Sequence, residues 1–323
     1  MKKYSRCLAT LVIIAASASV CVAQQGWAAA QRGVAGTDLN TVYFADSKRG
    51  WIAGDDGYVS YTADGGRTWA RQALDTKDAV NDIYFRNKED GYLLAGNRIF
   101  KTDDSGRTWR AATGFPPKDF EGASAELYSV RFSSKKKGWV IGSLSRGDTV
   151  VDSLLIYTND EGSSWLRKTA PVRGELIHLD FISDARGWIV GAGGTILYTE
   201  DAGETWIIQR SAVSETLYHV DFQNDKKGWV VGEHGIVLRT VDGGATWSKI
   251  PVPVHSTLLS VQFVDDDNGW IVGRGGVVLR SSDGGLTWLQ QDSKSVQNLY
   301  ALYFEKKNGW AVGGDGIVLQ YER

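Results

Sequence analysis

Short apolar runs recur along most of the chain, separated by glycines and charged residues. Four such runs follow one another at Leu217–Phe222, 228–231, 236–240 and 247–250. They are rich in β-branched and aromatic residues, and no window carries a sustained helical period. The pattern therefore predicts a unit of four short β-strands.

Two series of aromatic positions show how often this unit repeats. Gly-Trp pairs, with one Gly-Tyr, place aromatic residues 40 to 49 positions apart, at Trp51, Tyr92, Trp139, Trp188, Trp229, Trp270 and Trp310. A second series comprises Trp27, Trp69, Trp109, Trp165, Trp206, Trp247 and Trp288. A period of about 40–45 residues with several short strands is typical of a propeller blade. We predict an all-β fold, a single seven-bladed β-propeller of four-stranded blades over residues 24–323.

The two ends of the chain predict how the ring closes. The last unit supplies three strands and stops at Arg323, while Trp27 occupies the place of the fourth-strand Trp288. We expect residues 27–31 to complete the seventh blade, which would leave no large sheet edge exposed.

Residues 1–23 have the features of a signal peptide. Lys2, Lys3 and Arg6 precede an uncharged, mostly apolar stretch over 8–20, and small residues precede a cleavage site after Ala23. The sequence thus predicts export to the periplasm or the extracellular space. Cys21 leaves a lipoprotein as an alternative, although Val20 and Ala18 fit a lipobox poorly.

Composition narrows the classes of function. The chain has 36 basic and 38 acidic residues, a balance that argues against a nucleic-acid-binding domain. No stretch beyond residue 23 resembles a membrane span. The acidic run from Asp265 to Asn268 has Gly276 where an EF-hand would carry its last glutamate. No metal or cofactor is therefore predicted.

A motif of the form Thr/Ser-x-Asp-x-Gly-x-Thr/Ser-Trp lies between the third and fourth strands of six units. Its aspartates are Asp64, Asp104, Asp160, Asp201, Asp242 and Asp283. An aspartate can accept backbone N–H groups of its own turn, and glycine allows positive φ. Six equivalent copies indicate a structural role for these aspartates.

These repeats resemble the Asp-box, or bacterial-neuraminidase, repeats, and residues 228–247 are similar to the unit of the photosystem II stability and assembly factor family. The resemblance implies a non-catalytic propeller, exported across a membrane, that binds a membrane-protein subunit or its precursor. It implies the thylakoid lumen if the source is photosynthetic, and a non-photosynthetic bacterial relative is an alternative. The chain departs from cyanobacterial members in its poor lipobox and its scattered arginines.

A glycan-binding or glycoside-hydrolase propeller of sialidase-like type is the alternative function. A sialidase needs three arginines, a tyrosine nucleophile and an acid on its inner strands. Arg131 is the single arginine in the inner strands that the pattern predicts. Xyloglucan-degrading relatives resemble two propellers facing one another, whereas this chain predicts one. We therefore expect no enzymatic activity.

Propeller geometry predicts the binding face, here called the top face, where the inner strands begin. The residues expected there include Asn40, Asn81, Ile177, Leu259, Asp55, Asp56 and Asp315. The binding residues that we predict are Tyr128, His178, Tyr218, His219, Glu233, His234, Arg274 and Tyr300. Ordinary channel lining with bound water is the alternative, and it also explains the two histidines better than a ligand pair does.

Two irregular segments, 111–125 and 142–153, lengthen loops that we expect on this same face beside Tyr128. Insertions that gather on one face of a repeat array often mark its binding side. Lysines at 135–137, 226–227 and 306–307 fall on the opposite face, where we expect solvated turns rather than a basic patch.

Overall fold

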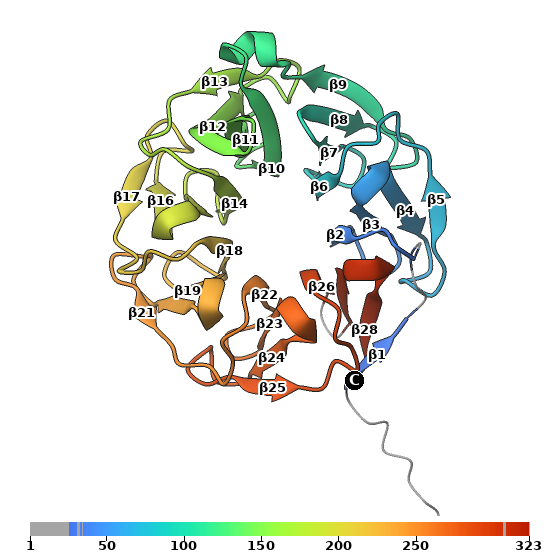
Figure 1. Ribbon diagram of the computed structural model, residues 1–323, viewed down its shortest axis with the longest axis vertical. Coiled ribbons are helices and arrows are strands. Elements are labelled where there is room, and N and C mark those ends of the chain that lie inside the picture. The colour runs from blue at the N-terminus through green and yellow to red at the C-terminus, as the bar shows by residue number, and fades with distance from the viewer. Residues whose placement is uncertain (1–25, 31–32, 34, 306–307, 323) are drawn as a thin grey trace, which may run out of the picture.

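The computed structural model describes residues 26–30, 33, 35–305 and 308–322. Seven antiparallel four-stranded sheets stand around a central axis (Figure 1), which confirms the predicted propeller. The predicted signal peptide, 1–23, lies outside the described residues. Within them, no helix is long and apolar enough to cross a membrane.

Each blade begins at the centre of the ring. The innermost strands are β2 (Leu39–Phe44), β6 (Val80–Phe85), β10 (Ser124–Phe132), β14 (Leu176–Phe181), β18 (Leu217–Phe222), β22 (Leu258–Phe263) and β26 (Leu299–Glu305). The second strands are β3 (Gly50–Gly54), β7 (Gly91–Ala95), β11 (Gly138–Arg146), β15 (Gly187–Gly191), β19 (Gly228–Gly232), β23 (Gly269–Gly273) and β27 (Asn308–Gly313).

The chain then moves outward through two more strands. The third strands are β4 (Tyr58–Thr62), β8 (Arg98–Thr102), β12 (Thr149–Thr158), β16 (Thr195–Thr199), β20 (Val237–Thr240), β24 (Val278–Ser281) and β28 (Val318–Glu322). The outer strands are β5 (Ala70–Gln72), β9 (Arg110–Gly114), β13 (Leu166–Lys168), β17 (Ile207–Gln209), β21 (Ser248–Lys249), β25 (Leu289–Gln291) and β1 (Gly26–Ala29). Single 3-10 turns are η1 (Asp55–Gly57), η2 (Pro117–Phe120), η3 (Ala192–Gly194), η4 (Glu233–Gly235), η5 (Arg274–Gly276) and η6 (Gly314–Gly316).

The Gly-Trp pair builds the core between neighbouring blades. Trp229 in blade five stacks on Phe263 in blade six, with ring centroids 3.5 Å apart, and both rings are buried. A Cβ on Gly228 would lie 2.5 Å from the Phe222 ring of its own blade, so only glycine leaves room for that phenylalanine. The repeated pair therefore joins each blade to the next.

The Asp-box turns have the hydrogen bonds predicted for them. In blade one the Thr68 amide donates to Asp64 Oδ1 at 2.9 Å and the Thr68 hydroxyl donates to Oδ2 at 2.6 Å. The Thr62 hydroxyl also donates to Asp64, at 2.8 Å. These bonds hold the pKa of Asp64 down at about 2 and fix the turn between the third and outer strands.

The ring closes as predicted, through the N-terminal strand. β1 pairs antiparallel with β28, Trp27 lying opposite Tyr321. Trp27 is buried and meets the Phe304 ring edge-on at 5.7 Å. Trp310 of blade seven stacks on Phe44 of blade one at 3.7 Å, so the joint between the last and first blades matches the others.

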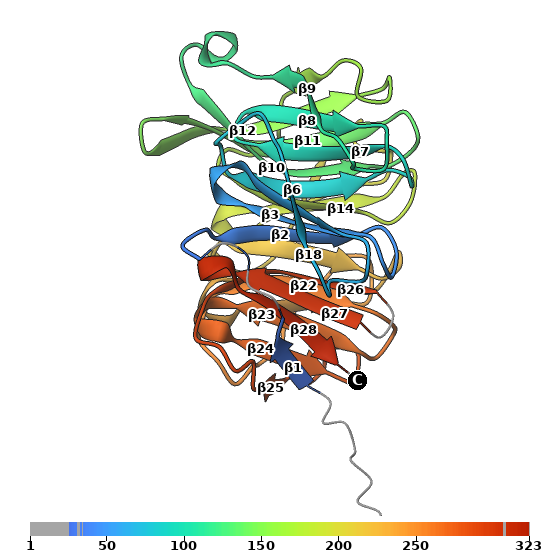
Figure 2. The ribbon, with the colours of Figure 1, turned by 90° about the vertical axis from the view of Figure 1, so that its right-hand side faces the viewer.

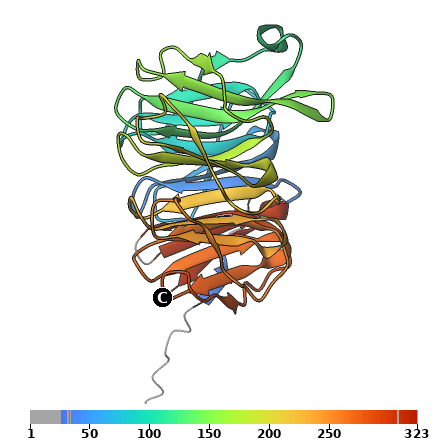
Figure 3. The ribbon, with the colours of Figure 1, turned by 90° about the vertical axis from the view of Figure 1, so that its left-hand side faces the viewer.

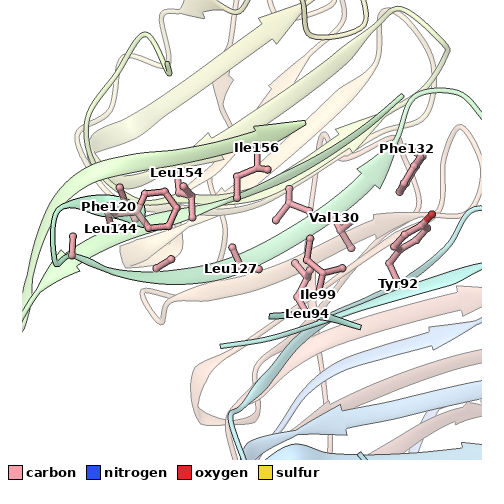
Figure 4. Packing of buried hydrophobic residues seen from close by; sticks show 13 residues of the cluster. Tyr92, Leu94, Ile99, Phe120, Leu127, Val130, Phe132, Leu144, Leu154 and Ile156 are labelled. Atoms are coloured by element: carbon pink, nitrogen blue, oxygen red, sulfur yellow. The ribbon is translucent and has the colours of Figure 1, made fainter. Parts of the chain in front are cut away.

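In blade three, the prediction of a long loop was wrong. Residues 142–153, expected as a loop, fold into the ends of β11 and β12, which pair as far as Arg146 and Thr149. This hairpin and η2 project on the side of the molecule that carries the other 3-10 turns (Figures 2 and 3). Phe120, Leu144 and Leu154 belong to one buried cluster (Figure 4), and this packing holds the projection against the blade.

Candidate binding face and central channel

A β-bulge at the same place in every inner strand shapes the centre of the propeller. In β2, Leu39 pairs with Gly54 and Thr41 with Ala53, so the register skips Asn40. Equivalent register shifts occur in the other six inner strands. A bulge adds one residue to a strand and re-aims its side chains. The bulges here allow consecutive residues, such as Asn40 and Thr41, to line one cavity of about 460 Å³.

Three rings of equivalent positions follow one another along the inner strands. The mouth ring consists of the bulged residues Asn40, Asn81, Tyr128, Ile177, Tyr218, Leu259 and Tyr300. The middle ring consists of Thr41, Asp82, Ser129, His178, His219, Ser260 and Ala301. The lower ring consists of Tyr43, Tyr84, Arg131, Asp180, Asp221, Gln262 and Tyr303.

The three tyrosines of the mouth ring are half-buried, and each hydroxyl meets a carboxylate. The Tyr300 hydroxyl donates to Asp38 at 2.8 Å, the Tyr128 hydroxyl to Glu175 at 3.2 Å, and the Tyr218 hydroxyl to Glu233 at 3.5 Å. Burial raises the pKa of Tyr128 to about 12. The tyrosines are thus held as neutral hydrogen-bond donors around the mouth of the channel.

The predicted loop residues lie on the 3-10 turns next to this ring. Glu233 Oε2 accepts the Thr216 amide at 2.9 Å, which ties η4 to the start of blade five. His234 and Arg274 are exposed on η4 and η5. His234 occupies a position with φ of 53°, where the equivalent residue in η5 is a glycine. The structure therefore brings Tyr218 and Glu233 together and leaves His234 and Arg274 at the solvent-facing rim.

The two histidines lie one ring deeper than the tyrosines. The rings of His178 and His219 stack with centroids 3.7 Å apart. Arg131 Nη2 lies 3.1 Å from His178 Nε2. Burial and the neighbouring Arg131 guanidinium hold the pKa of His219 down at about 3, and burial with His219 and Arg131 holds the pKa of His178 well below its usual range. Both imidazoles are neutral at physiological pH.

Sequence reasoning missed three aspartates that line the same cavity. Each carboxylate accepts a backbone N–H from the next blade: Asp82 that of Val130 at 2.9 Å, Asp180 that of Phe222 at 3.0 Å, and Asp221 that of Phe263 at 2.8 Å. The available signal was the aspartate repeated at the same position of two neighbouring inner strands, Asp180 in β14 and Asp221 in β18, whereas Asp82 lies two positions earlier in β6. These aspartates link neighbouring blades around the channel.

The cavity is lined by three aspartates, Asp82, Asp180 and Asp221, and by one arginine, Arg131. Arg131 Nη1 pairs with Asp82 at 2.6 Å. Burial, together with the adjacent Asp180, raises the pKa of Asp221 to about 8, and burial also raises the pKa of Asp180.

Among the described residues, no group of three or more His, Cys, Asp or Glu side chains could hold a metal ion.

The blade-three projection stands beside the mouth ring. The Tyr128 hydroxyl lies 3.3 Å from Ser143 Oγ on β11. Arg146 near the tip of the hairpin lies 3.8 Å from Glu121, which follows η2, and the Arg167 guanidinium lies 5.5 Å from the Phe120 ring. The two irregular segments therefore adjoin one another, as the sequence predicted.

The same fold occurs in solved structures of several functions. A structure described as YCF48 bound to D1 peptide is 22% identical, with a TM-score of 0.75, and the match covers 94% of this chain and 96% of that one. YCF48 from Cyanidioschyzon merolae is 19% identical, with a TM-score of 0.74, over 92% of this chain and 98% of that one. The GH74 enzyme of Niastella koreensis matches at 15% identity and a TM-score of 0.70, over 91% of this chain but 53% of the enzyme.

Sequence comparison adds a curated relative and a family model to these structural matches. The photosystem II assembly lipoprotein Ycf48 of Synechococcus sp. (strain CC9902) is 34% identical over 70 residues, and the match covers 21% of each chain. The model of the family described as photosynthesis system II assembly factor YCF48 matches residues 69–170, 165–253 and 246–322. Since these matches span most of the propeller, the chain belongs to the photosynthesis system II assembly factor YCF48 family.

Proposed function

We propose that this protein is an exported, non-catalytic propeller that binds a polypeptide segment of a membrane-protein subunit or its precursor and thereby assists assembly of the complex. The observation that carries the proposal is the match of the family model across residues 69–322. The structural relative with a bound D1 peptide supports a protein as the partner.

The top face supplies the surface for this function. Tyr128, Tyr218 and Tyr300 surround the channel mouth, and aromatic residues often dominate the energy of protein interfaces. Carboxylate hydrogen bonds hold their hydroxyl groups in place, so little side-chain entropy is lost on binding. The adjacent blade-three hairpin adds a raised edge against which a peptide can lie.

We infer the compartment from the sequence of residues 1–23. Cleavage after Ala23 would release the propeller into the periplasm or the extracellular space, or into the thylakoid lumen of a photosynthetic source. Secretion of a reporter fused behind residues 1–23, and its retention when the apolar stretch over 8–20 is interrupted by charges, is the test of this part.

The function itself is tested by affinity capture. The tagged propeller, residues 24–323, is incubated with a detergent extract of membranes from the source organism, and captured material is identified by mass spectrometry. Reproducible recovery of one membrane-protein subunit or its precursor supports the proposal. Recovery of polysaccharide alone, or turnover in a panel of sialosides and β-glucans, supports the glycan-directed alternative and contradicts it.

A further inference from the structure

The lower channel holds more acidic groups than the fold pairs with cations. Asp180 and Asp221 line it, with Asp82 in the middle ring just above, whereas Arg131 is the one basic side chain among the cavity residues besides the two neutral histidines. None of these charged side chains is needed by the proposed top-face contact.

Arg131 is already engaged. Its Nη1 lies 2.6 Å from Asp82 Oδ2 and 2.7 Å from the Val130 carbonyl oxygen, and its Nη2 faces His178. Neither Asp180 nor Asp221 forms an ion pair among the described residues, although the charge of the nearby Arg131 acts on Asp180. Asp221 Oδ2 accepts the Phe263 amide. Asp180 Oδ2 accepts the Phe222 amide, and the Phe181 amide also bonds to the Asp180 carboxyl group. No side-chain donor bonds to either carboxyl group among the described residues.

The opposite arc of the channel is aromatic. Tyr303, Tyr43 and Tyr84 hold the lower-ring positions of blades seven, one and two, and all three line the cavity. Tyr303 and Tyr43 lie with ring centroids 5.6 Å apart. Aromatic rings attract organic cations, and the Arg131 guanidinium already lies 5.4 Å from the centroid of the Tyr84 ring.

Two further observations point to a ligand. Nδ1 of His219 is enclosed and has no hydrogen-bond partner in the described part of the chain, next to the carboxylates in the cavity wall. The cavity volume of about 460 Å³ also falls within the range of about 300–1,000 Å³ common for small-ligand sites.

We propose that the channel binds an organic cation, a guanidinium or alkylammonium group, between Asp180 and Asp221 on one side and the tyrosine arc on the other. The inference goes beyond the proposed function, because a small free cation suffices as the ligand. The same chemistry is offered by an arginine or lysine side chain of a polypeptide partner.

Proton release gives the proposal a specific signature. Because burial and Asp180 raise the pKa of Asp221 to about 8, this carboxyl is protonated at neutral pH. A bound cation favours the ionised carboxylate. Binding at about pH 7 therefore expels up to one proton per site.

Isothermal titration calorimetry of the propeller, residues 24–323, with N-acetyl-arginine amide at about pH 7 tests the site, with the neutral isostere N-acetyl-citrulline amide as the matched ligand. We expect the arginine compound to bind at least about tenfold more tightly, with a heat that changes between phosphate and Tris buffers because protons are released. Equal binding of the two compounds, or no binding of either, overturns the proposal.

Matched variants locate the site. Asp221→Asn and Asp180→Asn keep an oxygen that can accept the Phe263 or Phe222 amide, so the fold is retained and melting curves check it. Each should weaken the arginine compound about tenfold or more, and Asp221→Asn should abolish proton release. Asp266→Asn, an exposed change outside the channel, is the control. Wild-type affinity and proton release in both channel variants contradict the assignment.

Two further ligands distinguish the sources of the cation. Tighter binding of the capped tripeptide glycyl-arginyl-glycine than of the diamine putrescine assigns the site to a side chain of a partner, and the reverse order assigns it to a free amine. Either order supports the cation site. Cation affinity is measured on the propeller without its membrane partner, so a failure of the top-face proposal remains separable from a failure of this one.

Discussion

The indole N–H of Trp51 in blade one donates a hydrogen bond to the carbonyl oxygen of Gly106 in blade two at 3.3 Å. Gly106 lies in the Asp box, so the contact joins the two repeated motifs in one joint between blades. Trp139 and Trp229 make the corresponding bonds to the next blade's box, to Ala202 at 2.9 Å and Gly284 at 3.2 Å. The joint explains why both motifs recur together along the chain.

Gly106→Ala should destabilise this joint. The residue has φ of 72°, and a Cβ there would lie 2.5 Å from Trp51 Cζ2. The left-handed conformation alone costs about 1–2 kcal/mol and overpacking a further 1–3 kcal/mol. Gly193→Ala is the matched control, since φ is 63° and a Cβ meets nothing within 4 Å. Urea unfolding should show a clearly larger loss for Gly106→Ala, and equal losses would argue against the joint.

The Asp-box aspartates should matter for stability and not for binding. Asp242→Ala removes the acceptor of the Thr246 amide, which donates to Asp242 Oδ1 at 2.9 Å. Because this turn is exposed, we expect a loss of about 1 kcal/mol, as for an exposed helix cap. Affinity for the captured partner, measured where both proteins are folded, should be unchanged. A folded Asp242→Ala protein that no longer binds would give the box a functional role.

Deletion of residues 26–30 should open the seventh blade. It removes β1 and the buried Trp27, and loss of a buried tryptophan side chain alone is worth about 3–5 kcal/mol. Thermal unfolding of the shortened chain should show a much lower midpoint than that of the protein lacking residues 1–23. Equal midpoints would refute the closure by β1.

The raised pKa of Asp221 leads us to expect that the stability of the protein depends on pH. Its pKa is about 8 in the folded protein and about 4 in an unfolded chain, so the folded state holds more protons between these values. The free energy of unfolding should therefore fall as pH rises from about 4 towards 8. Asp221→Asn removes this component, and its stability should depend less on pH in that window. Parallel pH profiles for the two proteins would contradict the assigned pKa.

Repeat spacing was enough to predict the ring, its seven blades and the closing strand. The reason is that the repeated residues make the same contacts from blade to blade. Gly228 leaves room for a phenylalanine of its own blade, and Trp229 stacks on Phe263 of the next blade. The hairpin of blade three was mistaken for a loop. Its polar residues at 145–149 hid the alternation, while Leu144 packs on Phe120, which only the folded chain brings near.

The channel was predicted less completely than its mouth. Tyr128, Tyr218 and Tyr300 could be placed because they occupy the same repeat position in recognisable inner strands. Asp180 and Asp221 were missed because a one-residue bulge changes which side chains face inward, and sequence alternation alone does not reveal a bulge. The consequence of that bulge, the pairing of each aspartate with the next blade, became visible only in three dimensions.

The central claim, that a polypeptide partner binds the top face, is tested most directly by measuring partner affinity in three folded variants. The first is Tyr128→Ala, the second replaces residues 145–151 by Asn-Gly, which can close the hairpin between Leu144 and Asp152, and the third replaces the lysines at 135–137 by alanine.

We expect each of the first two variants to weaken binding about tenfold or more, and the lysine variant to bind as the wild type does. Loss of binding in the lysine variant, with unchanged affinity in the two top-face variants, would place the partner on the opposite face and contradict the account.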